Sequence, residues 1–437
     1  MAQEMEERHA GGGRRRRRVA IVLGTCALAA LLIIALSLRS RSPYECVSVS
    51  SEGAQGNDRS AMPSISADGR FVAFQSYASN LVPHDTNECV DVFVHDRRTG
   101  RTERVSVSSW GAEADSWCWL PSISADGRFV AFESDASNLV PGDTNQQWDI
   151  FVHDRETGLT ERVSVSSEGA ESNAGSSEPS ISADGRFVAF ESKASNLVPG
   201  DTNGCVDVFV YDRQTARTER ASVSFEGAEA SWDNWEPAIS AHGRFVAFKS
   251  GGIFAHDRQT GRTERLSATP EDAEANYGSW SPSISADGRF VAFTSLHTNP
   301  VTGDANVTWD VFVHDRETGL TERVSVSSEG AKTHSRGDMP SISADGRFVA
   351  FLSDASNLAA GDTSGMSDVF VHDRHTGGTE CVSGPNGGDE PALSADGRFV
   401  AFTAYPPLHR APGLERFMGS GKQTDEQIYV YDRGRQE

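Results

Sequence analysis

Sequence signatures of the common hydrolases and nucleotide-binding enzymes are missing from this chain. It has no Gly-x-Ser-x-Gly segment, which would mark the nucleophile of an α/β-hydrolase. It also has no His-Glu-x-x-His and no phosphate-binding loop. These absences favour a binding protein over an enzyme. A glycosidase or polysaccharide lyase is the alternative, because such an enzyme needs only a few well-placed side chains, and the many carboxylates here do not single out a pair.

Positive charge is scarce after the N-terminus. Residues 1–42 contain eight arginines and three glutamates, a charge of +5. The remainder contains 32 Lys and Arg against 59 Asp and Glu, a charge of −27. A body this acidic repels phosphate, which excludes a nucleic-acid partner. The excess charge favours solubility, a monomer and, weakly, cationic partners.

Cysteine is also infrequent, with six in 437 residues. Cys26 lies in an apolar stretch, and the other five are Cys46, Cys89, Cys118, Cys205 and Cys381. An odd number leaves at least one thiol unpaired. Cys89 with Cys118 is the pair to test, because both are expected in loops on one face of adjacent repeats.

One long apolar run stands near the N-terminus. Residues 1–18 end in five consecutive arginines, and residues 19–38 contain no charge. Twenty helical residues span a bilayer, and the arginines are expected on the cytoplasmic side. We therefore expect a basic cytoplasmic stub (1–18), a single membrane anchor (19–38), a linker (39–43) and an extracytoplasmic body. A signal peptide cleaved near Ala35-Leu36-Ser37, giving a secreted protein, is the alternative.

Internal repeats dominate the rest of the chain. Residues 64–74 read Ser-Ile-Ser-Ala-Asp-Gly-Arg-Phe-Val-Ala-Phe, and this segment returns unchanged or nearly so six more times. The later copies begin at Ser122, Ser180, Ala238, Ser283, Ser341 and Ala392. The steps between copies are 58, 58, 58, 45, 58 and 51 residues. The fourth unit is therefore short, and the seventh departs from the pattern after Ala404.

Each unit predicts four short strands, here called a to d. Strand a is Pro-Ser-Ile-Ser, and the following Asp-Gly favours a tight hairpin turn. Strand b is Phe-Val-Ala-Phe, apolar on both faces like a strand packed between sheets. Strand c is Asp-Val-Phe-Val-His-Asp-Arg. Strand d is Thr-Glu-Arg-Val-Ser-Val-Ser, whose alternation suits an outer strand.

The strand count predicts a closed ring. The seventh unit ends with strand c at residues 427–433 and has no strand d. Residues 44–50, Tyr-Glu-Cys-Val-Ser-Val-Ser, form an unpaired strand d ahead of the first unit. Pairing the two would remove two open edges. We therefore expect an all-β fold, a seven-bladed β-propeller of four-stranded blades over residues 44–433, closed by the N-terminal strand.

The repeat resembles a known family. Ser-x-Asp-Gly-x-x-Val-Ala-Phe followed by Asp-Val-Phe-Val-x-Asp is similar to the WD40-like propeller repeat of TolB and related bacterial exported proteins. The resemblance covers residues 44–433 and implies the blade, without specifying an activity. The chain departs from TolB-like proteins, for which the resemblance implies six blades behind an α/β domain, because it predicts seven units without such a domain.

Tryptophan gathers in two sets of loops. In a propeller, the d-to-a and b-to-c connections emerge on the same face. Aromatic rings beside carboxylates suit sugars, cationic groups or a protein partner, so this face predicts the binding site. Sealing of the gaps between blades by the indoles is the alternative. The candidate binding residues are Trp110, Trp117, Trp119, Trp232, Trp235 and Trp280, and Trp148 and Trp309 lie in b-to-c loops.

The b-to-c loops also repeat Asp-x-Asn-x-x-x-Asp. Oxygen ligands at alternate positions are what Ca²⁺ prefers, so calcium is a possible cofactor. Asx-turns explain the same pattern, and the late glutamate of an EF-hand is missing. The copies are Asp85/Asn87/Asp91, Asp143/Asn145/Asp149, Asp201/Asn203/Asp207 and Asp304/Asn306/Asp310.

A histidine recurs in strand c. It stands at His95, His153, His256, His314 and His372, and tyrosine takes the same position at Tyr211 and Tyr431. A metal site would not accept this exchange, so we expect aromatic packing or hydrogen bonding instead.

Overall fold

A computed structural model describes residues 42–224, 227–267, 278–296, 308–331, 335–359, 365–406 and 425–435. Contacts divide the chain into two units, Met1–Pro43 and Tyr44–Glu437. The expected anchor, residues 19–38, lies outside the described residues. Among the residues described, no helix has the length and apolar character needed to cross a membrane.

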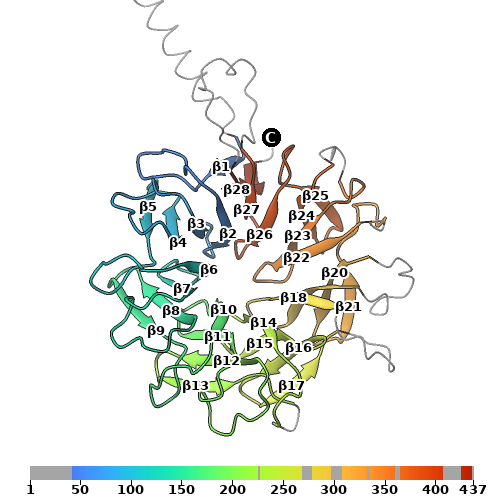
Figure 1. Cartoon of the computed structure of the whole chain (residues 1–437). Helices are drawn as coiled ribbons and strands as arrows, with labels where there is room; N and C mark the ends of the chain where they lie inside the picture. Colours follow the sequence, from blue (N-terminus) through green and yellow to red (C-terminus); the bar gives the residue numbers. More distant parts are fainter. Residues whose placement is uncertain are drawn as a thin grey trace, which may run out of the picture. The chain divides into compact units, whose positions relative to one another are not determined.

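Strands of the second unit form seven antiparallel sheets of four strands within the described residues, arranged as blades around a centre (Figure 1). Blade 1 comprises β2 (Ser60–Ile65), β3 (Phe71–Ser76), β4 (Asp91–Asp96) and β5 (Arg101–Arg104). Blade 2 comprises β6 (Cys118–Ile123), β7 (Phe129–Ser134), β8 (Asp149–Asp154) and β9 (Leu159–Arg162). Blade 3 comprises β10 (Ser176–Ile181), β11 (Phe187–Ser192), β12 (Asp207–Asp212) and β13 (Arg217–Arg220).

The remaining blades repeat this order. Blade 4 comprises β14 (Trp235–Ile239), β15 (Phe245–Lys249), β16 (Ile253–Asp257) and β17 (Arg262–Arg265). Blade 5 comprises β18 (Ser279–Ile284), β19 (Phe290–Ser295), β20 (Asp310–Asp315) and β21 (Leu320–Arg323). Blade 6 comprises β22 (Gly337–Ile342), β23 (Phe348–Ser353), β24 (Asp368–Asp373) and β25 (Gly378–Cys381). Blade 7 comprises β26 (Asp389–Leu393), β27 (Phe399–Ala404), β28 (Gln427–Asp432) and β1 (Tyr44–Cys46), and a 3-10 helix (Arg433–Arg435) follows. The predicted seven-bladed propeller is confirmed.

Closure by the N-terminal strand is also confirmed. β1 pairs antiparallel with β28, with Glu45 opposite Val430. The Val47 amide continues this pairing by donating to the Ile428 carbonyl at 2.9 Å. Ser48 Oγ donates to Gln427 Oε1 at 2.7 Å. Residues from the two ends of the propeller thus share one sheet.

A second closure runs around the innermost turns. In each blade the alanine before Asp-Gly (His-Gly in blade 4) donates its amide proton to the same alanine carbonyl of the next blade. The donors and acceptors are Ala67 to Ala125, Ala125 to Ala183, Ala183 to Ala241, Ala241 to Ala286, Ala286 to Ala344, Ala344 to Ala395 and Ala395 to Ala67, at 2.9–3.0 Å. This alanine ring returns to its starting residue, so the blades form a complete circle.

The tight turn also sets the distance between neighbouring blades. Gly127 has a φ of +74°, which glycine adopts without strain. A Cβ at this residue would lie 2.2 Å from Cδ2 of Phe71 in the preceding blade. Asp126 Oδ1 accepts hydrogen bonds from Ser124 Oγ and the Arg128 amide and so fixes the turn. The Asp-Gly turn therefore forms the hairpin and also leaves room for the aromatic ring of the preceding blade to pack against it.

The core lies between blades. Strands b and c each supply a buried phenylalanine, such as Phe74 and Phe93, whose ring centroids are 5.9 Å apart. These two pack in one cluster with Ile428 and Val430 of blade 7. Full burial of such a side chain is worth about 1.5–3 kcal/mol. The apolar runs of strands b and c thus bind each blade to both neighbours.

An arginine at the end of strand c links each blade to the one before it. Arg155 of blade 2 bonds Glu103 Oε1 of blade 1 at 2.6 Å and stacks over Phe71, 4.4 Å from the ring centroid. Arg97 makes the corresponding ion pair with Glu45 of β1 at 2.8 Å. This contact between blades explains why Thr-Glu-Arg and His-Asp-Arg recur in the repeats.

The strand c histidines act through hydrogen bonds, as expected. His95 Nδ1 lies 2.8 Å from Thr102 Oγ1, and the threonine hydroxyl donates to the Val49 carbonyl of blade 7. Because that donation uses the only hydroxyl proton, Nδ1 of His95 carries the hydrogen of the first bond. Burial lowers the pKa of His95, which keeps the ring neutral.

Strand d is shorter than predicted. The expected Thr160–Ser166 strand ends at Arg162, because a side chain then replaces the backbone ladder. Ser164 Oγ accepts from the Ile150 amide at 3.0 Å and donates to Asp149 at 2.5 Å. Strand a is longer than predicted, since β6 begins at Cys118, before the expected Pro121.

The suggested Cys89–Cys118 disulfide is wrong. Within the described residues, Cys46, Cys89, Cys118, Cys205 and Cys381 are all free thiols. Cys118 is buried in strand a, where its sulfur lies 3.3 Å from Ser134 Oγ, and the Cys89 sulfur donates to its own loop at Asn87. The two side chains therefore point to different partners.

Candidate binding face and channel mouth

The predicted tryptophans all lie where strand a begins, strand b ends and strand c begins. Antiparallel register brings these ends to one face of the ring, here called the loop face: Cys118 pairs with Ser134, and Ser134 with Asp149. Trp110, Trp117, Trp232 and Trp235 are exposed, with 63%, 49%, 68% and 36% of their surface accessible. Trp119, Trp148, Trp280 and Trp309 are half-buried. Exposed indoles do not seal blades, whereas the half-buried ones contribute to packing.

Three aromatic rings gather at the border of blades 1 and 2. The Tyr77 and Trp119 centroids are 5.9 Å apart with an interplanar angle of 83°. The Trp117 and Trp119 centroids are 6.1 Å apart at 80°. Tyr77 is exposed and was not among the predicted residues. Its position directly after strand b was the available signal, because most other units have no aromatic residue there.

A pocket of about 260 Å³ adjoins these rings. It is lined by Ala61, Met62 and Leu120, by Tyr77 and Trp119, and by the polar side chains of Arg59, Gln75, Glu133 and Glu390. We call it the blade 1–2 pocket. A second hollow of about 420 Å³ is lined by Trp280, Ser281, Trp309, Arg336 and Asp338. Both hollows combine indole rings with polar groups.

Strand a carries a bulge toward the centre of the ring. In every blade the residue before the strand a proline has a positive φ, between 49° and 55°. These bulge residues are Met62, Leu120, Glu178, Glu236, Ser281, Met339 and Glu390. With their prolines, six of them line a central hollow of about 270 Å³. A non-glycine residue in this conformation costs about 1–3 kcal/mol unless its surroundings hold it.

Side-chain oxygens hold the bulges in place. In blades 1 to 3, the fifth residue of strand b, the variable position in Phe-Val-Ala-Phe-x-Ser, accepts a hydrogen bond from the bulge amide of the next blade. Gln75 accepts from Leu120 at 2.9 Å, Glu133 from Glu178 at 3.3 Å and Glu191 from Glu236 at 2.8 Å. The other bulge amides donate to carboxylates as well, namely Ser281 to Glu236, Met62 to Glu390, Met339 to Asp338 and Glu390 to Asp389.

Carboxyl groups therefore lie close together at the central hollow lined by the bulge residues, here called the channel mouth. Several of them have raised pKa values. Burial, together with the charges of Glu236 and Glu133, raises the pKa of Glu191 to about 7. Burial also raises the pKa values of Glu133, Glu236 and Glu390. Lys249 is a cation near Glu191 and Glu236, and its ammonium lies 2.7 Å from the Trp280 ring centroid. Sequence reasoning missed this cluster, although the variable strand b position within a constant repeat marks it.

Glu178 differs from the other carboxylates. Its side chain reaches the channel, and its carboxylate has no hydrogen-bond or ion-pair partner among the residues that the structure describes. The protein around it and repulsion from Glu191, Glu133 and Glu236 raise its pKa to about 8. Its side chain is nevertheless exposed, so water also solvates the ionised form.

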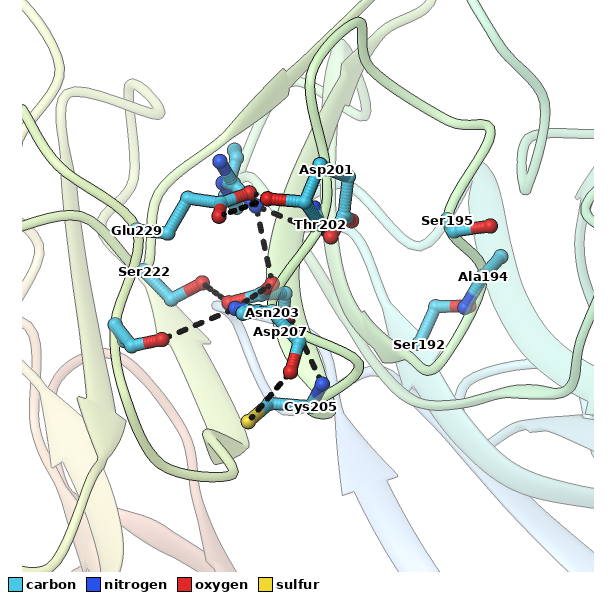
Figure 2. Close-up of polar contacts among 12 residues, drawn as sticks. Ser192, Ala194, Ser195, Asp201, Thr202, Asn203, Cys205, Asp207, Ser222 and Glu229 are labelled. Carbon is cyan, nitrogen blue, oxygen red and sulfur yellow. Dashed lines mark hydrogen bonds and ion pairs between the residues drawn. The ribbon is translucent and has the colours of Figure 1, made fainter.

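The candidate calcium loops surround an arginine. In blade 3, Arg220 Nη1 lies 3.4 Å from Asp201, 3.2 Å from Asp207 and 3.0 Å from Glu229. Figure 2 shows these carboxylates converging, with Ser222 and Asn203 beside Asp207. The same arrangement places Arg104 among Asp85, Asp91 and Glu113, and Arg162 among Asp143, Asp149 and Glu171.

The asparagine of each loop makes an Asx-turn. Asn203 Oδ1 accepts from the Cys205 amide at 2.9 Å, and its Nδ2 donates to Asp207. Asn87 and Asn145 repeat these contacts. Asp310 pairs with Arg323, whereas Asp304 and Asn306 lie outside the described residues. Across the described ranges, no group of three His, Cys, Asp or Glu side chains is arranged to hold a metal ion.

Comparisons with known proteins relate this chain to others by fold. No protein-family model matches, and no curated protein sequence matches. Among solved structures, oligogalacturonate lyase from Vibrio parahaemolyticus is 12% identical, with 89% of this chain and 96% of that chain covered and a TM-score of 0.54. An oligogalacturonate lyase in complex with manganese is 11% identical, with coverages of 86% and 89% and a TM-score of 0.52. TolB from Acinetobacter baumannii is 16% identical, with coverages of 78% and 67% and a TM-score of 0.39. At these identities, the chain shares a β-propeller fold with the lyases.

Proposed function

We propose that this protein is a binding protein that receives a glycan or protein partner on its loop face. The observation that supports this most directly is the set of exposed indoles, Trp110, Trp117, Trp232 and Trp235, on the face that also carries the blade 1–2 pocket. Large exposed aromatic side chains gathered on one face are typical of recognition surfaces. The opposite face carries the short a-to-b and c-to-d turns.

The negative charge of the propeller indicates which classes of ligand it can bind. The chain after residue 42 has a charge of −27, and the carboxyl groups of Glu178 and Glu390 line the central hollow. A polyanion such as an oligogalacturonate would be repelled from this surface. A lyase acting on acidic polysaccharide is therefore not favoured, in spite of the fold shared with such lyases. Neutral or cationic partners fit the charge.

The proposal includes the membrane anchor and the side of the membrane on which the propeller lies. Residues 19–38 would anchor the protein as a single span, with residues 1–18 in the cytoplasm and the propeller on the extracytoplasmic side. A monomer would present one loop face per anchor. Membrane fractionation tests this arrangement: the full chain should stay in the membrane after a carbonate wash. A mature N-terminus near Leu38 would instead support export after cleavage.

A triple substitution tests the loop face. The full chain, kept in a detergent without a sugar headgroup, is applied to a glycan array and to cross-linking with extracytoplasmic proteins. Trp117→Ala, Trp232→Ala and Trp235→Ala together should abolish capture, because three exposed contact surfaces are lost while the core is untouched. Leu159→Ala, at an exposed site on the opposite face, is the control. Capture unchanged by the triple substitution would reject this face.

A second candidate, a glycosidase, rests on Glu178. A carboxylic acid that stays protonated near neutral pH can serve as a proton donor to a glycosidic oxygen. The pKa of Glu178 is raised toward this range, and the carboxyl groups of Glu191, Glu133 and Glu236 lie near it. Glycan turnover that is lost in Glu178→Gln while the melting temperature is kept would support the enzyme. Turnover equal in both proteins would exclude Glu178 from such a role.

A further inference from the structure

The blade 1–2 pocket has an unusual polar lining. Gln75 is 94% buried, since only 6% of its surface is accessible, and it lines this pocket. Its Oε1 accepts the Leu120 amide proton, which fixes the amide orientation. Among the described residues its Nε2 makes no hydrogen bond, and this nitrogen is open to the pocket rather than enclosed by protein. Two N–H donors thus face the open pocket, where a ligand or water can accept them.

Acceptors face the same pocket. Glu133 uses Oε2 to accept from Ser177 and Glu178. Glu390 uses Oε2 to accept from Met62 and Thr403. In both carboxylates the second oxygen makes no hydrogen bond to a described residue. The pocket therefore brings donors and acceptors from blades 1, 2 and 7 together around one small volume.

The aromatic rings supply the remaining wall. Tyr77 and Trp119 stand nearly perpendicular to each other at the pocket, and one ring face of such a pair can stack on the C–H groups of a ring-shaped ligand. Ala61, Met62 and Leu120 add an apolar floor. The volume of about 260 Å³ lies just below the usual range of small-molecule pockets, which begins at about 300 Å³.

These groups select a ligand that both accepts and donates hydrogen bonds. A cation would face the Gln75 N–H groups and Arg59 at the rim, where Arg59 pairs with Glu426 at 2.5 Å. An anion would face Glu133 and Glu390. Hydroxyl groups can accept from Gln75 and donate to the carboxylates, and a pyranose ring places several of them around an apolar face.

We infer that the blade 1–2 pocket binds a neutral pyranose ring at the end of a glycan, with Trp119 as the stacking platform and Gln75 as the hydrogen-bond donor. This inference rests on the proposed binding function of the loop face and names its ligand class. The recognised sugar is uncharged and carries adjacent hydroxyl groups.

A substitution already present in the other blades tests this inference. Blades 2 and 3 carry Glu133 and Glu191 at the strand b position of Gln75, and both accept the bulge amide of the next blade. Gln75→Glu therefore keeps an acceptor for the Leu120 amide, removes the two N–H donors and adds a carboxyl group to the pocket. Trp119→Ala and Tyr77→Ala remove the aromatic wall, and Leu159→Ala on the opposite face is the control.

The full chain, in a detergent without a sugar headgroup, is titrated with the methyl glycosides of glucose, galactose, mannose and N-acetylglucosamine. We expect at least one of them to bind with a Kd on the order of 1 mM, as suits about a dozen heavy atoms. Gln75→Glu and Trp119→Ala should each weaken it at least tenfold, while both variants keep the circular dichroism of the folded protein and the affinity of Leu159→Ala is unchanged.

The contrary outcomes are distinct. Binding of none of the four glycosides, binding that survives both pocket substitutions, or binding of choline in their place would overturn the inference. The loop-face proposal would still stand in each case if the triple tryptophan substitution abolished capture of a partner. If that capture were unchanged, the proposed function would fail independently of the sugar titration.

Discussion

At the scale of single residues, the repeat assigns different tasks to glycines that look alike in sequence. Gly127 and Gly158 have nearly the same φ, +74° and +73°. A Cβ at Gly127 would overlap the ring of Phe71, whereas a Cβ at Gly158 would have no atom within 4 Å. The two positions therefore separate backbone strain from a contact between blades.

We expect Gly127→Ala to destabilise the propeller by about 3–4 kcal/mol, because strain at positive φ and overpacking against Phe71 add together. Gly158→Ala should cost about 1 kcal/mol, from the strain alone. Urea denaturation followed by circular dichroism measures both. Equal losses in the two variants would contradict the role of the turn in spacing the blades.

Glu191 predicts the dependence of stability on pH. Its pKa rises on folding from about 4.5 to about 7, so the folded state loses stability relative to the unfolded state as pH increases through this range. Glu191→Gln keeps an acceptor for the Glu236 amide and removes the charge. We expect it to raise stability at pH 8 by up to about 3 kcal/mol and to leave stability at pH 4 unchanged.

Asp154 is the control for Glu191, because its pKa is lowered on folding instead of raised. Its bidentate bond to Arg128 holds its pKa well below the usual range, so its contribution is present above pH 4 and is lost as pH falls further. Asp154→Asn should therefore lower stability at pH 7 and have a smaller effect at pH 2. Thermal melts across this pH range distinguish the two signs, and the same sign for both variants would refute the assignments.

At the scale of the element, the b-to-c loop and strand d act together. Arg162 comes from strand d and forms ion pairs with Asp143, Asp149 and Glu171, so a protein cation occupies the loop. Burial raises the pKa of Asp143 to about 6 even beside this arginine. The loop thus depends on its guanidinium for stability.

Replacing that cation tests what the loop can bind. Arg162→Met should destabilise the protein by about 3–5 kcal/mol, because it leaves buried carboxylates unpaired. Millimolar Ca²⁺ should then raise the melting temperature of the variant and leave that of the unsubstituted protein unchanged, with Na⁺ at equal ionic strength as the control. An equal rise in both proteins would assign the loops to calcium.

The strands and turns were predictable from the sequence because the same pattern of apolar and turn residues occurs seven times. The arginine within each loop was missed, since Thr-Glu-Arg lies far from Asp-x-Asn along the chain and meets it only in the folded sheet. The end of strand d at Arg162 was missed for a similar reason: Ser164 takes over a backbone bond that alternation alone cannot reveal.

The candidate site was predictable only in part. The tryptophans were found because aromatic residues in loops stand out in composition. Gln75, Glu133 and Glu191 occupy the one variable position of strand b, and their shared task appears only when the bulge of the next blade is placed beside them. Burial and the carboxylates of Glu191, Glu133 and Glu236 raise the pKa of Glu178, and Glu133 and Glu236 come from neighbouring blades, which no local pattern records.

At the scale of the whole molecule, the ring is closed by β1 and by the alanine ring. A chain that starts at residue 51 would leave β28 with an open edge, whereas a chain that starts at residue 42 keeps β1. We expect the shorter chain to melt at least 10 °C lower and to self-associate, because an open edge pairs with other chains. Differential scanning calorimetry and light scattering measure this, and equal melting temperatures would contradict closure.

Because the first and last strands lie side by side in blade 7, the place where the chain begins is architecturally arbitrary. Joining the ends of the propeller with a short linker and cutting between other repeats should produce a circular permutant with the same seven blades. Each c-to-d turn, such as the one at Gly158, is open enough to receive the new ends. The loop face could thereby be attached to a membrane anchor or a fusion partner from any sector of the circle.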